Sequence, residues 1–207
     1  MKSKNAMVNA GLLMLVMLMG AGCAVPTMNM KHEASVGVTY PTKGKLQVEK
    51  FNDSRPSDEK VVHQTAVNKI TPQIWSGNTS PEMMEFFQTT LEQEATQAKL
   101  FTLGPGEYQL SGTVTSLKVD RTCTIFRYLL GIFDFPKLEA NVAYRVILSR
   151  NGEVVLTKEI SHTKSSKYWA MTEMSWTQVS NKARRVLDEA ITESIKLLFD
   201  EIDQKAK

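Results

Sequence analysis

Cysteine is scarce in this sequence of 207 residues, which contains only two, Cys23 and Cys123. Disulfide-stapled scaffolds and multi-cysteine zinc or iron–sulfur modules need four ligands in one place, so both classes are excluded. A strong excess of one charge is also absent, because 25 basic and 22 acidic side chains give a net charge of +3. A nucleic-acid-binding protein would be expected to gather a larger basic excess on one face, so no nucleic-acid partner is predicted.

The amino-terminal apolar run is too short to remain as a membrane-spanning helix. Gly11–Met19 is less than half of the about 20 apolar residues that cross the hydrocarbon core of a bilayer. It follows Lys2 and Lys4 and precedes small residues, which is the order of a secretory signal peptide. We therefore assign residues 1–22 to a cleaved signal, whose removal brings the net charge to about +1.

Cys23 stands directly after Ala21 and Gly22, at the end of the apolar run. This arrangement resembles the bacterial lipobox, although Gly20 occupies the place where leucine is usual. The resemblance implies covalent N-acyl and S-diacylglycerol groups at Cys23 and no other cofactor; several acyl chains anchor a protein stably. Ala24, rather than aspartate, follows the cysteine, which in Gram-negative lipoproteins implies the outer membrane, facing the periplasm. The alternative is a plain secretory signal with an incidental cysteine.

The mature chain divides into a tether, one domain and a tail. Residues 23–43 mix proline, glycine and polar residues without sustained periodicity, which is typical of a tether between a lipid anchor and a folded body. A single periplasmic domain is predicted over residues 44–203, followed by a tail over residues 204–207. Alternating apolar residues within the tether indicate one short edge strand, over Val36, Val38 and Tyr40.

Four segments alternate apolar and polar residues with the period of half-buried strands. They are Lys45–Phe51, Tyr108–Val119, Leu138–Leu148 and Val154–Ile160. The apolar parity switches near Ser116, which predicts a β-bulge there. Asn151-Gly152 separates the last two segments and favours a two-residue hairpin turn, because both turn positions need positive φ.

Two further segments carry apolar stripes at helical spacing. The first is predicted to begin at Ser80-Pro81, where a hydroxyl can cap the helix and proline can occupy its first position. The second begins near Trp176 and has an apolar stripe wide enough that it must pack on a sheet. The order strand, helix, three strands, helix predicts an α+β fold, with an antiparallel or mixed sheet of four to five strands and two helices packed on one face.

Catalytic and metal-binding motifs are missing from the sequence. It contains no G-x-S-x-G elbow, no H-E-x-x-H, no P-loop and no dinucleotide-binding glycine pattern. The histidines His32, His63 and His162 are far apart and have no partner at helical or hairpin spacing, so no metal site is predicted. The carboxylate pair Asp188/Glu189 has basic neighbours and is predicted to lie on a solvated helix face. We expect no catalytic residues, and a hydrolase is the weakest functional hypothesis.

The connection between the second and third strands is unusually apolar. A hairpin connection is normally short and polar, and Cys123, near its start, is expected to be buried. One interpretation is a helical turn that completes the core; the other is an exposed tip that contacts lipid headgroups or a partner protein, because soluble proteins rarely leave such patches bare. The candidate contact residues are Ile125, Phe126, Tyr128, Leu129, Leu130, Ile132, Phe133 and Phe135.

Taken together, these features resemble the YajG-like family of bacterial outer-membrane lipoproteins. The residues that carry this resemblance are the lipobox at Cys23, the strand-to-turn stretch Val48–Pro56, the helix Met83–Ala98, the Gly104-Pro105-Gly106 break, and the Asn151-Gly152 hairpin before a long final helix. The element order is also similar to that of the exopolysaccharide-export lipoprotein PelC, the lipopolysaccharide-assembly lipoprotein LptE, and auxiliary lipoproteins of lipid-transporting ABC systems.

The resemblance implies a non-enzymatic accessory or scaffold in cell-envelope assembly or export. Its implied partners are the membrane, through the lipid anchor, and envelope proteins. The likeness to PelC further implies a homo-oligomeric ring with the aromatic residues of the 125–135 loop toward the membrane. The alternative is a periplasmic lipid- or glycan-binding lipoprotein in which the same loop acts as a lid.

Overall fold

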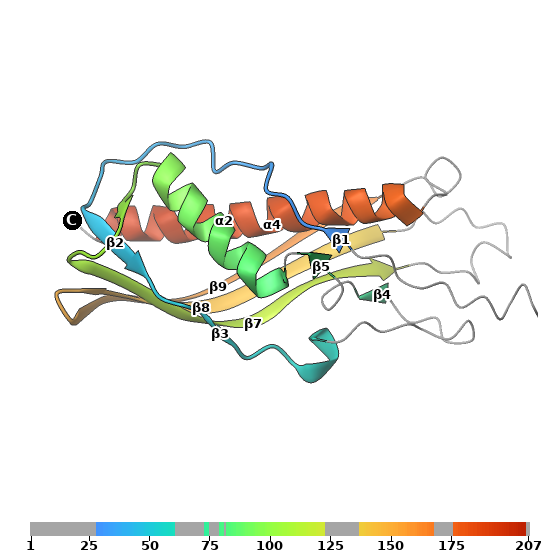
Figure 1. Cartoon of the computed structure of the whole chain (residues 1–207), viewed down its shortest axis with the longest axis horizontal. Coiled ribbons are helices and arrows are strands. Elements are labelled where there is room, and N and C mark those ends of the chain that lie inside the picture. Colours follow the sequence, from blue (N-terminus) through green and yellow to red (C-terminus); the bar gives the residue numbers. More distant parts are fainter. Residues whose placement is uncertain are drawn as a thin grey trace, which may run out of the picture.

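The structure is a computed structural model that describes residues 28–60, 73–74, 79–80, 82–122, 137–167 and 176–205. Within these ranges, two helices pack against a mixed sheet (Figure 1). In chain order the elements are β1 Met28–Asn29, β2 Lys45–Val48, β3 Asn52–Asp53, the 3-10 turn η1 Ser57–Glu59, β4 Gln73–Ile74, β5 Thr79–Ser80, α2 Met83–Gln97, β6 Thr102–Leu103, β7 Tyr108–Thr122, β8 Lys137–Arg150, β9 Glu153–Lys167 and α4 Trp176–Lys205.

The centre of the sheet is an antiparallel meander of the three long strands β7, β8 and β9. β2 lies parallel to β7 and extends the sheet to the edge strand β6, while β3 and β4 pair with β7 further along its length. Side chains of β8 alternate between buried and partly exposed along nearly the whole strand, which confirms the predicted period of two. The sheet is wider than the predicted four to five strands because the two-residue strands β3, β4 and β6 add to it.

Two local predictions about this meander are confirmed. Asn151 and Gly152 form the β8–β9 turn with φ of 51° and 86°, the left-handed backbone that a two-residue hairpin needs. The β7–β8 register shifts between Val114 and Ser116, so the predicted bulge is present. Glu59 stabilises it, since its carboxylate accepts hydrogen bonds from the Leu117 amide at 3.3 Å and the Ser116 hydroxyl at 3.1 Å.

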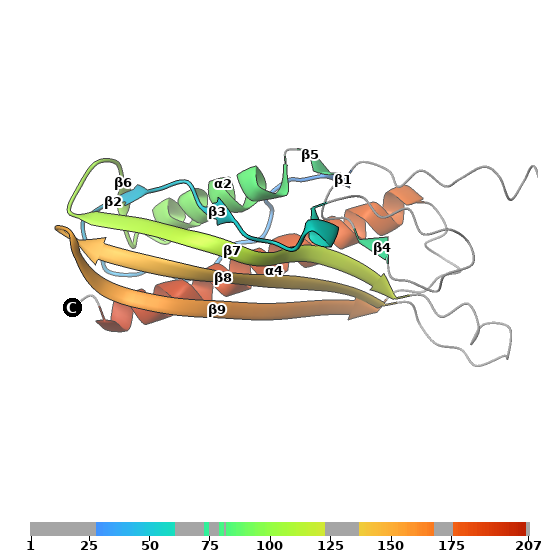
Figure 2. The same cartoon turned by 90° about the horizontal axis from the view of Figure 1, so that it is seen from below.

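Both helices cover one face of the sheet, as Figures 1 and 2 show from two directions. α4 lies along β8 and β9, and α2 packs beside α4. The predicted stripe of α2 is buried, and so is that of α4 from Val179 to Ile202. The predicted α+β class with two helices on one face is therefore confirmed.

The start of α2 differs from the prediction. Ser80 does not cap the helix; it lies in β5, where it pairs with Asn29 of β1. The helix begins at Met83, and Glu82 occupies the cap position without a side-chain hydrogen bond to the helix. The pairing of β5 with β1 holds the Ser80 backbone in an extended conformation, which explains the later start.

The prediction of a tether is wrong for residues 30–43, which we call the strap. The strap crosses both helices as irregular chain, so the short strand expected around Val38 does not form (Figure 1). Met30, Val36 and Tyr40 are buried in the core. The backbone amide of Tyr40 donates to the carbonyl of Ala98 at 2.8 Å, just beyond α2. The folded domain therefore includes residues that precede the predicted boundary at residue 44.

Candidate functional site

Two carboxylates lie buried where the strap crosses the helices. Glu94 of α2 has no exposed surface, and Asp188 of α4 is 2% exposed. The prediction that Asp188 lies on a solvated face is wrong, because the strap covers that part of α4. Burying a carboxylate is costly unless it is paired and hydrogen-bonded, so the partners of these two groups define the chemistry of the site.

His32 of the strap lies between the two carboxylates. Its Nδ1 is 2.7 Å from Asp188 Oδ1, and its Nε2 is 2.8 Å from Glu94 Oε1. A carboxylate on each side requires a proton on both ring nitrogens, which is the imidazolium form. The hydrogen bonds to Asp188 and then to Glu94 raise the His32 pKa from 6.5 to about 9, against the opposing effect of burial. Both partners are remote in sequence, so a search for partners at helical or hairpin spacing could not find them.

The remaining carboxylate oxygens bind the strap backbone. Asp188 Oδ2 accepts hydrogen bonds from the amides of Glu33 at 2.7 Å and Ala34 at 2.8 Å. Glu94 Oε2 accepts from the amide of Val36 at 2.8 Å. All four carboxylate oxygens are thus occupied by donors from the strap.

Arg184 of α4 adds a second contact one helical turn before Asp188. Its guanidinium donates to the carbonyl of Lys31 at 2.8 Å and to the carboxylate of Glu33 at 2.9 Å. We call His32, Glu94, Arg184 and Asp188 the strap clamp. Its donors and acceptors are engaged with one another or with the rest of the strap. No group of three or more metal-type ligands occurs in the described part of the chain. The geometry suits fastening a segment of chain rather than general acid–base chemistry.

One sequence signal could have revealed the clamp. Glu94 lies three residues after Leu91 and one before Ala95, within the apolar stripe that the sequence predicts to be buried. A charged residue on a buried helix face requires a partner of opposite charge. The sequence could not show that this partner is His32, because 62 residues separate the two.

The other histidine among the described residues also has a carboxylate partner. His162 Nε2 of β9 is 2.8 Å from Glu193 Oε2 of α4. Glu193 also pairs with Lys164 of β9, and Lys158 pairs with Glu201 of α4. These contacts fasten α4 along β9 at the surface, and Glu193 is 31 residues from His162, beyond helical or hairpin spacing.

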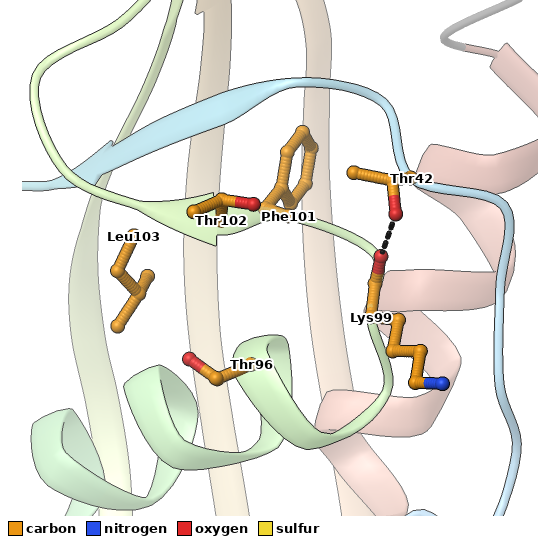
Figure 3. Close-up of a pocket in the computed structure, with 6 residues that line it drawn as sticks. All are labelled: Thr42, Thr96, Lys99, Phe101, Thr102 and Leu103. Carbon is orange, nitrogen blue, oxygen red and sulfur yellow. Dashed lines mark hydrogen bonds between the residues drawn. The ribbon is translucent and has the colours of Figure 1, made fainter.

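A shallow pocket of about 370 Å³ lies between the strap, the end of α2 and β6 (Figure 3). Two of its polar side chains already hydrogen-bond to the backbone. The Thr42 hydroxyl donates to the Lys99 carbonyl at 2.8 Å, and the Thr96 hydroxyl donates to the Glu92 carbonyl at 3.1 Å. The pocket is at the β2–β6 end of the molecule, remote from the ends of β7 and β8 that flank residues 123–136 (Figure 2).

The predicted site residues lie outside the described residues. These are Cys23 and the apolar contact residues between Ile125 and Phe135; Cys123 and His63 lie outside as well. The chain that flanks the loop is described: Thr122 and Lys137 pair with each other at the end of the β7–β8 ladder. β1 lies in the half of the molecule nearer that end (Figure 1).

The strap clamp lies on a fold that occurs in solved bacterial proteins. No protein-family model and no curated protein matches the sequence. The chain is similar to the crystal structure of a Xanthomonas campestris protein assigned to the DUF330 family model, with a TM-score of 0.53 and 14% identity over 85% of this chain and 97% of that one. This likeness shows a shared fold.

Two structures with lower scores have names that call them lipoproteins. One is a minor lipoprotein from Acinetobacter baumannii, with a TM-score of 0.40 and 12% identity over 80% of this chain and 93% of that one. The other is a putative lipoprotein from Caulobacter crescentus, with a TM-score of 0.39 and 12% identity over 59% of this chain and 82% of that one. In the described part of the present chain, no helix is long and apolar enough to span a membrane.

Proposed function

We propose that the protein is a lipoprotein acylated at Cys23 and anchored in the outer membrane, facing the periplasm. Its folded domain serves as a non-enzymatic accessory or scaffold in cell-envelope assembly or export. The signal sequence before Cys23 supports the anchor, and the strap clamp supports a binding or scaffolding role, because its buried charges serve to fasten chain.

The observation that carries the proposal is the position of the fastened strap. β1 starts at Met28, a few residues after Cys23, and the clamp begins at His32. The chain between Cys23 and Met28 spans at most about 18 Å at ~3.5 Å per residue. A lipid on Cys23 would therefore hold the domain against the bilayer, because the residues that looked like a long tether are packed on the helices.

The apolar 125–135 loop is proposed as the contact surface for the membrane or an envelope partner. Its flanking residues, Thr122 and Lys137, lie at the end of the sheet nearer β1. An anchor at Cys23 would therefore bring this end of the domain close to the bilayer. Apolar residues presented there would add affinity to that of the acyl chains.

The anchor can be tested in a Gram-negative host that expresses the full-length chain. Mass spectrometry of the amino-terminal peptide should show a triacylated Cys23, and density-gradient fractionation should place the protein with the outer membrane. A Cys23→Ser variant should lose both properties, whereas Ala24→Asp should keep the acyl chains and move to the inner membrane. Cleavage that leaves an unmodified Cys23 in a soluble protein would refute the proposal.

The loop can be tested separately with Phe133→Asp combined with Phe135→Asp. We expect this double variant to fold normally but to lose association with membranes or envelope proteins when the lipid is absent. Circular dichroism checks the fold, and co-fractionation of the unlipidated protein measures the association. Equal co-fractionation of the variant and its unlipidated parent would remove the loop from the proposal and leave the anchor in place.

A further inference from the structure

β6 is an edge strand of the described sheet, and part of its backbone has no partner. It runs parallel to β2 and pairs with no other described strand. The amides of Thr102 and Gly104 both donate to the β2 side, to the carbonyls of Gly44 and Leu46 at 3.0 Å each. Successive residues of an edge strand direct their backbone groups to opposite sides. The N–H and C=O of Leu103, which lies between these two donors, therefore point away from β2.

A shallow groove lies between this free edge and α2. Two pockets of about 370 and 310 Å³ adjoin there, because Thr96 and Leu103 line both of them. The side chains of these two residues point into the space between β6 and α2 (Figure 3). We call this surface, lined by Thr89, Glu92, Thr96, Lys99 and Leu103, the β6–α2 groove.

The groove has one exposed apolar side chain and a basic end. Leu103 is 39% exposed, although it is a large apolar residue. Lys99 is exposed and forms no ion pair in the described part of the chain. Glu92, the other charged lining residue, lies about 10 Å before Lys99 along the helix, at ~1.5 Å per residue. The end of the groove at Lys99 is therefore free to attract an acidic group.

We infer that the β6–α2 groove binds an extended, acidic peptide segment of an envelope protein. One residue of this segment would pair with Leu103, accepting a hydrogen bond from its N–H and donating one to its C=O, which is the β-augmentation mode of peptide recognition. An acidic side chain of the segment would pair with Lys99. Because Lys99 is four residues before Leu103, this side chain would lie within about four positions of the paired residue. The inference rests on the scaffold role proposed above and names the class of ligand.

The size of β6 favours a short peptide over the edge of a second sheet. The strand is two residues long and is followed by Pro105, and short edges next to proline resist open-ended sheet extension. A short segment needs only the Leu103 backbone on one side and α2 on the other. The groove is also at the β2–β6 end of the molecule, remote from the ends of β7 and β8 (Figure 2). An anchor at Cys23 would therefore leave it facing the periplasm.

The first test selects ligands from a phage-displayed library of short random peptides. The target is the full mature chain in detergent micelles, and empty micelles are the blank. We expect enriched peptides to combine an acidic residue with residues that favour an extended backbone, and to bind the protein in fluorescence polarisation. A selection without enrichment over the blank would overturn the inference.

The second test removes the unpaired backbone donor. Leu103→Pro deletes an N–H that the fold does not use, and proline is tolerated where the N–H of an edge strand faces solvent. The selected peptides should bind this variant at least tenfold more weakly, because they lose a hydrogen bond and meet the proline ring. Leu103→Val keeps the N–H and an apolar side chain, so it should bind within about twofold of wild type. Circular dichroism checks both folds, and equal binding by the proline variant would contradict the inference.

Hydrogen exchange locates the bound peptide on the strand. In the free protein the Leu103 amide should exchange much faster than those of Thr102 and Gly104, which are hydrogen-bonded to β2. A bound peptide should slow the Leu103 amide at least tenfold and leave the other two unchanged. A Leu103 amide that stays unprotected at saturation would place the peptide elsewhere and overturn the inference.

A charge exchange tests the basic end of the groove. Lys99→Glu should weaken an acidic peptide about fivefold, and a peptide with lysine in place of its acidic residue should recover this loss. Peptides that ignore both changes would refute the pairing with Lys99. Cys23→Ser should bind the peptides as tightly as the acylated protein, so a failed lipidation test leaves this inference standing. An acylated protein that binds no peptide would remove the inference and leave the anchor in place.

Discussion

Replacing His32 with glutamine should remove the cation between Glu94 and Asp188 and make the stability of the protein less dependent on pH. Glutamine can donate to one carboxylate but carries no charge, so two buried carboxylates would face each other without compensation. Removing one partner of a buried ion pair is strongly destabilising for this reason. The loss should appear first in the strap, whose amides at Glu33, Ala34 and Val36 bind these carboxylates.

The magnitude follows from the His32 pKa. A rise from 6.5 to about 9 corresponds to roughly 3 kcal/mol at ~1.4 kcal/mol per pKa unit. Breaking a buried pair is strongly destabilising, so we expect at least about 2 kcal/mol of this in the free energy of unfolding. Because the folded-state pKa is raised, the contribution is fully present below pH 6.5 and is lost as the pH rises through about 9.

Urea denaturation of the wild type and His32→Gln at several pH values measures this contribution directly. The difference in unfolding free energy should be largest near pH 6 and should shrink by about 2 kcal/mol by pH ~9.5. His162→Gln is the matched control, because His162 also contacts a carboxylate but its partner Glu193 is 43% exposed. A wild-type to His32→Gln difference that stays constant with pH would refute the assignment of the imidazolium to the clamp.

Three further substitutions test the clamp and the packing of the sheet. Asp188→Asn should lower the unfolding free energy by about 2 kcal/mol in urea titrations, because an uncharged asparagine side chain binds the His32 imidazolium and the backbone N–H groups of Glu33 and Ala34 weakly. The same variant should speed hydrogen exchange at those two backbone N–H groups. Gly112→Ala should cost about 2 kcal/mol or more by the same measurement, because its Cβ would lie 2.3 Å from the Phe51 ring and 2.7 Å from a backbone carbonyl. Glu59→Gln should cost about 1 kcal/mol and increase exchange at the Leu117 amide, with no change in the exchange of the β8–β9 turn.

The elements that sequence reasoning predicted well are those decided by neighbours in the chain. The alternation along β8, the bulge near Ser116 and the turn at Asn151-Gly152 each follow from side-chain periodicity or backbone preference over a few residues. The buried stripes of α2 and α4 follow from helical spacing in the same way. The α+β class was then fixed by element order, since both helices had to bury their stripes on the sheet.

The strap clamp could not be predicted in this way, because its partners are remote in sequence. His32 is 62 residues from Glu94 and 156 from Asp188. The polar and glycine-containing composition of the strap resembles that of a solvated tether, since its buried residues, such as Met30 and Val36, are spaced irregularly. The same reasoning placed Asp188 in solvent, because a charged residue on a helix is usually exposed unless another segment covers it.

The ionic character of the clamp explains how the strap is held in one position. Apolar side chains alone could bury the same area while the strap shifted along the helices, because apolar contacts are not directional. An imidazolium and three backbone amides on two fixed carboxylates allow only one alignment. That alignment fixes Met28 relative to α4, and therefore the length of chain between the domain and Cys23. The desolvation of three charged groups thus sets an upper limit on the distance between the domain and the proposed anchor, which an apolar strap that could shift would leave variable.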